Sequence, residues 1–426
     1  MPTTQLQLLK TRRFLPLFIT QFLGAFNDNA FKNALVILIT FRLAESVGFS
    51  PQILVTLAAG IFILPFFLFS ALAGQLADKY EKSFLIKIIK SVEIFLMVIA
   101  AAGFYWQNVP LLIFVLFALG THSTFFGPLK YAILPDHLQE NELIAGNGLI
   151  EAGTFIAILL GTIIGGVFIL STYGEYTISA LIISLAICGW LSSQFIPKTQ
   201  RYNPSLPISY HIFKETFQLI GYARARQDIY ACVLGISWFW LVGATFLAEL
   251  PVFAKNILHA NDHVVTFFLT LFSIGLALGS LLCNKLLKGK VHAAYVPFGA
   301  LGITLFTLDL YFTAGQTVTV ANNSMLIPLL TFLTTWQGWH ITVDLLLIAA
   351  CGGIYTVPLY AILQQRSEKD HRARVIASNN IMNALFMVGA AIATVCMLKA
   401  GLTVNHVFLV TAIANGFVAV YLYKLV

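Results

Sequence analysis

The sequence predicts an all-α polytopic membrane protein with twelve transmembrane helices arranged as two six-helix pseudo-repeats. Three observations carry this prediction: the composition, the spacing of apolar windows and the distribution of basic residues. Hydrophobic residues make up 58% of the 426 positions and charged residues only 10%, with a mean hydropathy of +0.85. These values lie far outside the range of soluble globular chains.

Apolar windows long enough to cross a bilayer, about 20 residues or more, occur in two sets of six. The first set covers residues 14–41, 51–77, 84–105, 109–130, 142–171 and 176–197. The second set covers 228–254, 263–288, 292–313, 341–364, 372–398 and 404–424. The outer segment from Thr313 to His340 holds the short apolar run Met325 to Thr334, which suits an interfacial or re-entrant piece.

The polar, basic segment 198–227 separates the two sets and predicts a linker between an N-terminal bundle, residues 1–197, and a C-terminal bundle, residues 228–426. Two alternatives stay open for this linker: an amphipathic helix on the inner membrane surface and a plain solvated segment. The apolar residues that favour the helix are Ile212, Phe213, Phe217, Leu219 and Ile220.

The net charge of +7 is explained by the membrane, since basic residues collect in cytoplasmic loops, and we expect no nucleic-acid partner. With both termini in the cytoplasm, only Lys32, Arg42, Lys255 and Lys399 of the 25 basic residues fall in spans or outer loops. The remaining ones, assigned to inner segments, include Lys79, Lys82, Lys87, Lys90 and Lys130.

Enzyme, cofactor and metal functions find little support. The five cysteines lie in apolar runs without CxxC spacing, which indicates neither a disulfide framework nor a metal site. A membrane acyltransferase would need a His-x4-Asp pair to activate a hydroxyl. His340 and Asp344 are one residue short of that spacing, and Asp309 and Asp344 are expected near the outer ends of their spans, without an assigned function.

The stretch Phe26 to Asn33 places Asn27, Asp28, Asn29 and Lys32 inside the first apolar window. A charge at the centre of a spanning helix costs at least about 2.5 to 3.5 kcal/mol, so such residues face a cavity or a partner. Two alternatives stay open for Asp28 and Lys32: a substrate site, and an i,i+4 salt bridge that neutralises both.

The two halves also repeat each other. Gly127 to Gly153 aligns with Val357 to Ala384, so that Pro128 meets Pro358 and Asn147 meets Asn379. A duplicated six-helix unit points to a transporter with a midplane site between the repeats, and Asn147 is one of the candidate substrate-binding residues.

Two further charged residues complete the candidate site of the first half. Glu151 lies about ten residues into its helix, roughly 15 Å along it, near the middle of the bilayer, and the alternative to a substrate role is a packing acid. Lys130 is either a head-group cation or a lysine that snorkels to lipid phosphate.

The seventh window contributes Trp238, Trp240 and Glu249. The two tryptophans either line an amphipathic route for the substrate or are ordinary buried aromatic packing.

The loop Gly74 to Ser83, GQLADKYEKS, resembles the loop signature of the major facilitator superfamily. The resemblance implies that Gly74, Asp78, Lys79 and Lys82 form a conformational latch. The counterpart in the second half, Gly279 to Lys290, has Asn284 near the acidic position.

Three motifs, AFNDNAF (Ala25 to Phe31), FGPLKYAIL (Phe126 to Leu134) and GNGLIEAG (Gly146 to Gly153), together resemble the bacterial lysophospholipid transporter family of that superfamily, including the transporter portion of acyltransferase fusions. The resemblance implies movement of lysophosphatidylethanolamine from the outer to the inner leaflet of the bacterial inner membrane for reacylation. It assigns the family's charged residues to Asp28, Lys130 and Glu151, whereas Lys32 stands where the family is more apolar.

The same resemblance implies a functional link to a lysophospholipid acyltransferase and an acyl carrier protein ligase, and no cofactor. The alternative function is a proton-coupled exporter of amphipathic drugs or other small molecules. Gly161 to Gly166, GTIIGG, partly resembles the antiporter signature of such exporters but lacks its proline.

Overall fold

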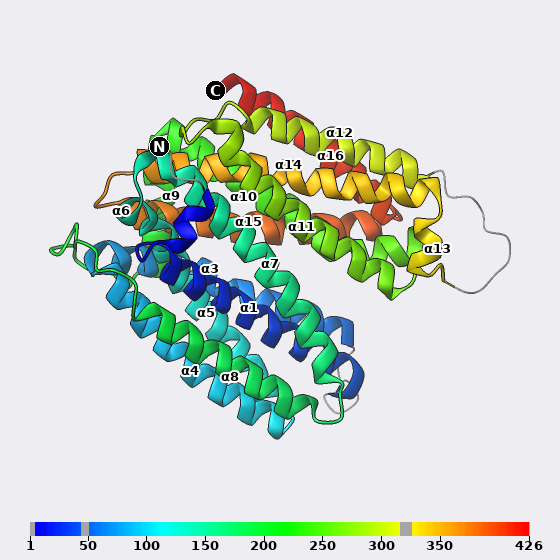
Figure 1. The fold of residues 1–426 in the computed structure, drawn as a ribbon, viewed down its shortest axis with the longest axis horizontal. Helices are drawn as coiled ribbons and strands as arrows, with labels where there is room; N and C mark the ends of the chain where they lie inside the picture. Colours follow the sequence, from blue (N-terminus) through cyan, green and yellow to red (C-terminus); the bar gives the residue numbers. More distant parts are fainter. Residues whose placement is uncertain (1–4, 44–50, 316–325, 426) are drawn as a thin grey trace.

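The computed structural model describes residues 5–43, 51–315 and 326–425, and these ranges are almost entirely helical (Figure 1). The first six long helices are α1 (Leu15–Leu38), α3 (Pro51–Lys79), α4 (Lys82–Tyr105), α5 (Val109–Ala132), α7 (Leu143–Ile169) and α8 (Gly174–Ser193). The second six are α10 (Gln227–Val252), α11 (Asp262–Leu287), α12 (Val296–Gly315), α14 (Trp336–Arg366), α15 (Arg372–Lys399) and α16 (Val404–Leu425). The short helices include η1 (Gln5–Lys10), α6 (Leu134–His137), α9 (Ile212–Ala225) and α13 (Leu329–Leu333).

Ten helices in the described ranges are long and apolar enough to cross a membrane. The long helices α1 and α4 are not among them; α1 carries Asp28 and Lys32 inside its length, and α4 carries Lys90 and Glu93. Both pack against other long helices, α1 on α7 and α8, and α4 on α8 and α5 (Figure 1). The all-helical membrane fold predicted from the apolar windows is therefore confirmed.

The long helices form two bundles. In the first bundle, lower in Figure 1, α1 packs on α7, α3 on α5 and α4 on α8. In the second bundle, upper in Figure 1, α14 packs on α11 and α12, α12 on α16 and α10 on α15. The two bundles touch each other mainly where α7 meets α11 and α3 meets α15.

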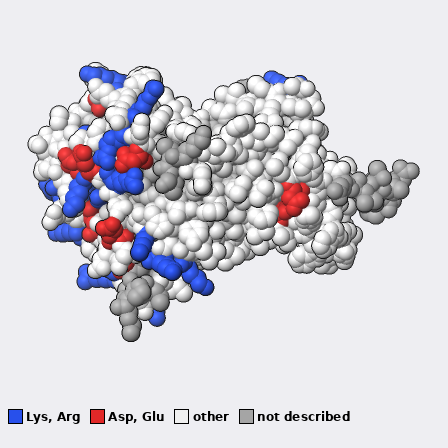
Figure 2. Space-filling view, turned by 90° about the horizontal axis from the view of Figure 1, so that it is seen from above, with Lys and Arg blue, Asp and Glu red and all other residues white. Residues whose placement is uncertain are grey.

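The charged side chains gather at one end of the molecule, the left end in Figure 2, while the rest of that face is mostly uncharged. We call this the charged end, and it comprises the segments 79–82, 134–142, 198–226, 288–292 and 366–372. The opposite end, which carries α13, we call the far end.

Helix α9 lies at the charged end and contacts both bundles, through α3 on one side and α15 and α10 on the other. Leu219 packs with Ala71 of α3 and Ala377 of α15. Phe213 and Phe217 are exposed, and the Phe213 ring centre lies 6.4 Å from that of Phe67 in α3. The segment between α8 and α10 thus contains a helix that contacts both bundles, and its place on the inner membrane surface stays a prediction.

The far-end segment between α12 and α14 differs from the predicted boundaries. Helix α14 begins at Trp336, not at 341, because the Thr335 hydroxyl caps it by accepting a hydrogen bond from the Gly338 N–H at 2.9 Å. The run Met325 to Thr334 is only partly described: Met325 lies outside the described residues, and Leu329–Leu333 form α13. Its interfacial or re-entrant role stays a prediction.

Candidate functional site

Asp28 and Lys32 of α1 are half-buried and point to different neighbours. Asp28 Oδ2 accepts a hydrogen bond from the Ser123 hydroxyl of α5 at 2.6 Å, and its Oδ1 is buried without a partner. Lys32 Nζ lies 5.5 Å from the ring centre of Phe62 in α3. Within the described residues no ion pair joins Asp28 to Lys32. The two side chains interact electrostatically but form no i,i+4 ion pair in this conformation.

The neighbouring amides do not face the same way as Asp28. Asn27 is fully buried, and its Nδ2 donates to Glu93 Oε1 of α4 at 2.8 Å. Asn29 Nδ2 donates to the Ala25 carbonyl one turn earlier, at 2.8 Å. The structure thus does not bring these two predicted site residues together with Asp28.

Glu93 is the centre of a buried ion network that links α1, α4 and α5. Its Oε2 lies 2.5 Å from Lys90 Nζ and 3.3 Å from His122 Nε2. Lys90 and Glu93 are 0% and 1% exposed. Such a buried pair persists only when both charges are compensated and hydrogen-bonded.

Lys90 corrects the sequence-based topology, which assigned it to an inner segment. It lies within α4 because Glu93, one turn along the same helix, neutralises it there. The spacing Lys87, Lys90, Glu93 at i, i+3, i+6 was the available signal for this missed network.

A second polar group lies where the bundles meet. Glu151 of α7 is fully buried and accepts a hydrogen bond from the Tyr131 hydroxyl, while its Oε2 has no partner. Lys130 Nζ lies 4.7 Å from the Tyr131 ring centre and interacts electrostatically with both Glu151 and Asp28. Lys130 thus lies within electrostatic range of Asp28 and Glu151, as Lys32 does of Asp28.

The second bundle completes this group through aromatic side chains. Tyr131 of α5 stacks on Tyr360 of α14, with ring centres 4.3 Å apart. The Trp240 indole N–H donates to the Tyr360 hydroxyl at 3.1 Å, and the Trp240 ring stacks on Phe155 of α7 at 6.3 Å. Trp240 thus faces the bundle boundary near Glu151.

Three other predicted site residues lie elsewhere. Trp238 points into the second bundle, where its indole N–H donates to Asn415 Oδ1 at 2.8 Å. Glu249 lies in the last turn of α10, at the far end. Asn147 exchanges two amide hydrogen bonds with Gln364 of the other bundle, at 2.7 and 2.9 Å, so it belongs to the contact between bundles.

Asp78 joins the bundles at the charged end. Its carboxylate accepts hydrogen bonds from the backbone N–H groups of Ala373 and Arg374, at 2.9 and 3.2 Å, and from Arg374 Nε at 2.9 Å. These N–H groups belong to the first turn of α15, where the helix dipole also favours a negative charge. Gly74, one turn earlier in α3, leaves room for this approach, since an added Cβ would lie 2.9 Å from Arg374 Cα.

The two lysines of the predicted latch have different places. Lys82 is buried and pairs with Asp136 at 2.9 Å, and Asp136 in turn contacts Arg372 of α15 at 3.4 Å. Lys79 Nζ lies 5.9 Å from the Tyr80 ring centre. The sequence reasoning missed Asp136, Arg372 and Arg374, because no local spacing links them to the loop Gly74 to Ser83.

The hydrogen bonds and ion pairs that join the bundles, as far as the described residues show, all involve the charged ends of the helices. At a second contact between the bundles, Gly148 of α7 approaches α11 so closely that an added Cβ would lie 2.5 Å from the Ser280 carbonyl oxygen. The protein is therefore closed between its bundles at the charged end.

A pocket of about 540 Å³ lies away from these residues, at the charged end of the second bundle. Its lining includes Gln227, Asp228, His292 and Arg366, and none of the predicted substrate-binding residues.

Comparison with known proteins identifies the family. The model of the Major Facilitator Superfamily matches residues 17–391. The curated Lysophospholipid transporter LplT of Citrobacter koseri is 27% identical over 381 residues, covering 87% of this chain and 85% of that protein. The protein of the same name from Salmonella newport is 26% identical over 388 residues, covering 87% and 84%.

Solved structures agree on the fold. A bacterial homologue of the iron transporter ferroportin in an outward-facing state has a TM-score of 0.70 at 11% identity, covering 96% of this chain and 99% of that one. The human organic anion transporter MFSD10 (TETRAN) has a TM-score of 0.73 at 12% identity, with the same coverage. At such identities the likeness concerns the fold alone. Since the family model spans most of the sequence and the twelve long helices form two bundles, this chain is a multi-pass membrane transporter that belongs to the Major Facilitator Superfamily.

Proposed function

We propose that this chain moves lysophospholipids of the lysophosphatidylethanolamine type from the outer to the inner leaflet of a bacterial inner membrane by alternating access. The observation that carries the proposal is the similarity to curated lysophospholipid transporters over 87% of the chain. The juxtaposition of Asp28, Lys130 and Glu151 supports the same substrate class.

The chemistry of the head group matches these three side chains. A lysophosphatidylethanolamine head carries an anionic phosphate and a cationic ammonium, and both need charged partners once they leave water. In the proposal, Lys130, with Lys32 farther along α1, binds the phosphate. Asp28 and Glu151 bind the ammonium, since each has a buried carboxylate oxygen without a hydrogen-bond partner.

The orientation of the transporter follows from its charge distribution. We place the charged end and both termini in the cytoplasm, because basic residues collect on that side of a membrane. The bundles, closed at that end, would then admit the lysolipid from the outer leaflet, with its acyl chain along apolar helix surfaces. Opening at the charged end would require Asp78 to leave the N-terminus of α15, which makes Gly74 and Asp78 the centre of the latch.

The test is a vesicle assay with head-group-labelled lysophosphatidylethanolamine placed in one leaflet. The purified chain is reconstituted as wild type and as Asp28→Asn, Lys130→Ala and Glu151→Gln, with Lys87→Ala as the control for loss of a lysine outside the site. We expect at least a tenfold fall in the rate for the three site variants and a wild-type rate for the control. Wild-type rates in all three site variants would overturn the site assignment.

Two extensions of the assay test the finer parts of the proposal. Addition of a lysophospholipid acyltransferase on the side of the charged end should convert the delivered lysolipid to phospholipid, as expected for reacylation. Absence of lysolipid movement by the wild type, together with efflux of a cationic dye under a pH gradient, would instead favour a proton-coupled exporter.

A further inference from the structure

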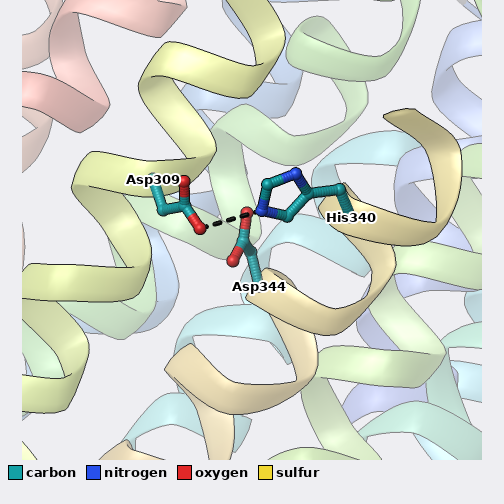
Figure 3. Close-up of side chains that lie close together, drawn as sticks. All are labelled: Asp309, His340 and Asp344. Atoms are coloured by element: carbon teal, nitrogen blue, oxygen red, sulfur yellow. Dashed lines mark hydrogen bonds and ion pairs between the residues drawn. The ribbon is translucent and has the colours of Figure 1, made fainter. Parts of the chain in front are cut away.

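Three metal-ligating side chains meet at the far end of the second bundle, between α12 and α14 (Figure 3). They are Asp309, His340 and Asp344, and one ligand atom from each lies within 4.8 Å of the others. His340 Nε2 already lies 2.9 Å from Asp309 Oδ2. Helix geometry explains the meeting, since His340 and Asp344 are one turn apart on the face of α14 that packs on α12.

Asp344 distinguishes this cluster from an ordinary surface group of acids. Its side chain is 1% exposed, and its Oδ2 is buried without a hydrogen-bond partner. Figure 3 shows its carboxylate directed toward Asp309 and His340. A buried carboxylate oxygen without a partner requires a positive charge or a donor that the surrounding side chains do not supply.

A contact to its other ring nitrogen orients the imidazole of His340. Its Nδ1 lies 3.4 Å from the Thr313 hydroxyl, which fixes the ring so that Nε2 faces the two carboxylates. Metal-bound histidines usually have such a partner on the ring nitrogen that does not bind the metal.

We propose that Asp309, His340 and Asp344 bind a divalent transition-metal ion such as Zn²⁺ or Mn²⁺. One imidazole nitrogen with two carboxylate oxygens is a donor set that favours these ions over Mg²⁺ and Ca²⁺, which prefer oxygen ligands alone. Ligand bonds to Zn²⁺ of about 2.0–2.2 Å place tetrahedral ligand atoms roughly 3.4 Å apart, so small side-chain rotations complete the site. Water would fill the remaining position, because Asp309 and His340 are partly exposed.

The site is separate from the lysolipid proposal and does not depend on it. Both helices belong to the second bundle, so the ion would join two helices that move together during alternating access. It would tie the end of α12 to the start of α14, on either side of the segment that contains α13. Its expected effect is on the stability of the far end and not on the rate of lysolipid movement.

The experiment uses the full chain in detergent, without an affinity tag. Isothermal titration with Zn²⁺ should show one saturable site in the wild type and at least tenfold weaker binding in Asp309→Asn and His340→Ala. Asp309→Asn is the more informative variant, because the Asp309 side chain is about half-exposed and we expect the substitution to preserve the fold. Asp262→Asn, an acid at the same end, and His371→Ala, from a second His and acid group at the charged end, are the matched controls.

Two readouts separate the outcomes. Zn²⁺ should raise the melting midpoint of the wild type and of both controls but not that of Asp309→Asn, since a ligand stabilises only the folded state that binds it. The proposal would be overturned if the wild type showed no saturable binding of Zn²⁺ or Mn²⁺. It would also be overturned if Asp309→Asn and His340→Ala bound Zn²⁺ as tightly as the wild type, or if His371→Ala lost binding. A shared proton among the three side chains would then account for the cluster.

Discussion

Tyr131 and Tyr360 stack across the two bundles, with ring centres 4.3 Å apart and planes inclined by 8°. They occupy equivalent positions in the internal repeat: Tyr131 follows Pro128 by three residues and Tyr360 follows Pro358 by two, because the first repeat has one more residue, Lys130, in between. Their hydroxyl groups differ in partner, since Tyr131 donates to Glu151 and Tyr360 accepts from Trp240. The contact thus lies on the axis that relates the halves, with an acid on one side only.

Replacing Tyr360 with alanine should favour opening at the charged end. The change removes an aromatic stack between the bundles, worth about 0.5–1.5 kcal/mol, whereas the hydrogen bond from Trp240 lies within the second bundle and does not oppose opening. We expect roughly a tenfold shift toward the open state, measured from distances between spin labels on the two bundles. Tyr355→Phe is the control, because its hydroxyl bonds to Gly235 within the second bundle; an equal shift in that variant would contradict the prediction.

Asp78→Asn should also favour opening at the charged end. The amide keeps the shape of the side chain but removes the charge that interacts with Arg374 and with the N-terminus of α15, and a helix terminus alone contributes up to about 2 kcal/mol. We expect at least a tenfold increase in the modification rate of a cysteine placed at the closed seam of the charged end. Asn284→Ala, at the counterpart position in the second half, should leave that rate unchanged. A matching increase in both variants would show that the charge is not the cause.

Lys90→Met should lower stability more than any loss of a surface lysine. It leaves Glu93 buried without its cation, and breaking a buried pair costs about 3–5 kcal/mol. Adding Glu93→Gln should recover most of the loss, because the neutral amide needs no cation and its oxygen still accepts from Asn27. Melting midpoints in detergent measure both effects, with Lys87→Met as the control. If Lys90→Met alone were as stable as Lys87→Met, the role of the pair would be refuted.

Glu81→Gln should show a pH-dependent loss of stability. Partial burial alone would raise the pKa of Glu81, but hydrogen bonds from Thr199, Ser83 and Phe84 outweigh it and hold the pKa below 4.5. Because the folded-state pKa lies below the unfolded one, the stabilisation is fully present above about pH 4.5 and disappears as the pH falls through the folded-state pKa.

At pH 7 the loss should be that of a helix cap, about 0.5–2 kcal/mol. The melting difference between wild type and variant should shrink on acidification. A constant difference from pH 7 to pH 3 would rule out the carboxylate as its source.

The spans were predictable because apolar length alone determines which segments can cross a bilayer. Their ends were less so: α14 begins at Trp336 because of the Thr335 cap, a single hydroxyl that hydropathy does not register. Lys90 shows a second limit, since counting basic residues cannot distinguish a loop lysine from one paired with Glu93 inside a helix.

The candidate site was partly predictable. Asp28, Lys130 and Glu151 stood out because isolated charges in apolar windows need a reason, and the structure places them near one another. Asn27 and Asn147 were singled out on the same ground, but they bond to Glu93 and Gln364. Which partner a polar group meets depends on contacts between distant segments, as for Asp136 and Arg372, and such contacts leave no local pattern.

The glycines at the closed end have a mechanical consequence. At Gly74 and Gly148 a helix of one bundle lies close to the backbone of the other, so that an added Cβ would lie 2.9 Å from Arg374 Cα and 2.5 Å from the Ser280 carbonyl oxygen, respectively. A single methyl group at either position would act as a wedge, since backbone cannot yield as a flexible side chain does. The equilibrium between the states closed and open at the charged end is therefore set in part by the size of the side chains at this contact. Gly74→Ala or Gly148→Ala would shift it toward the open state without altering any charge.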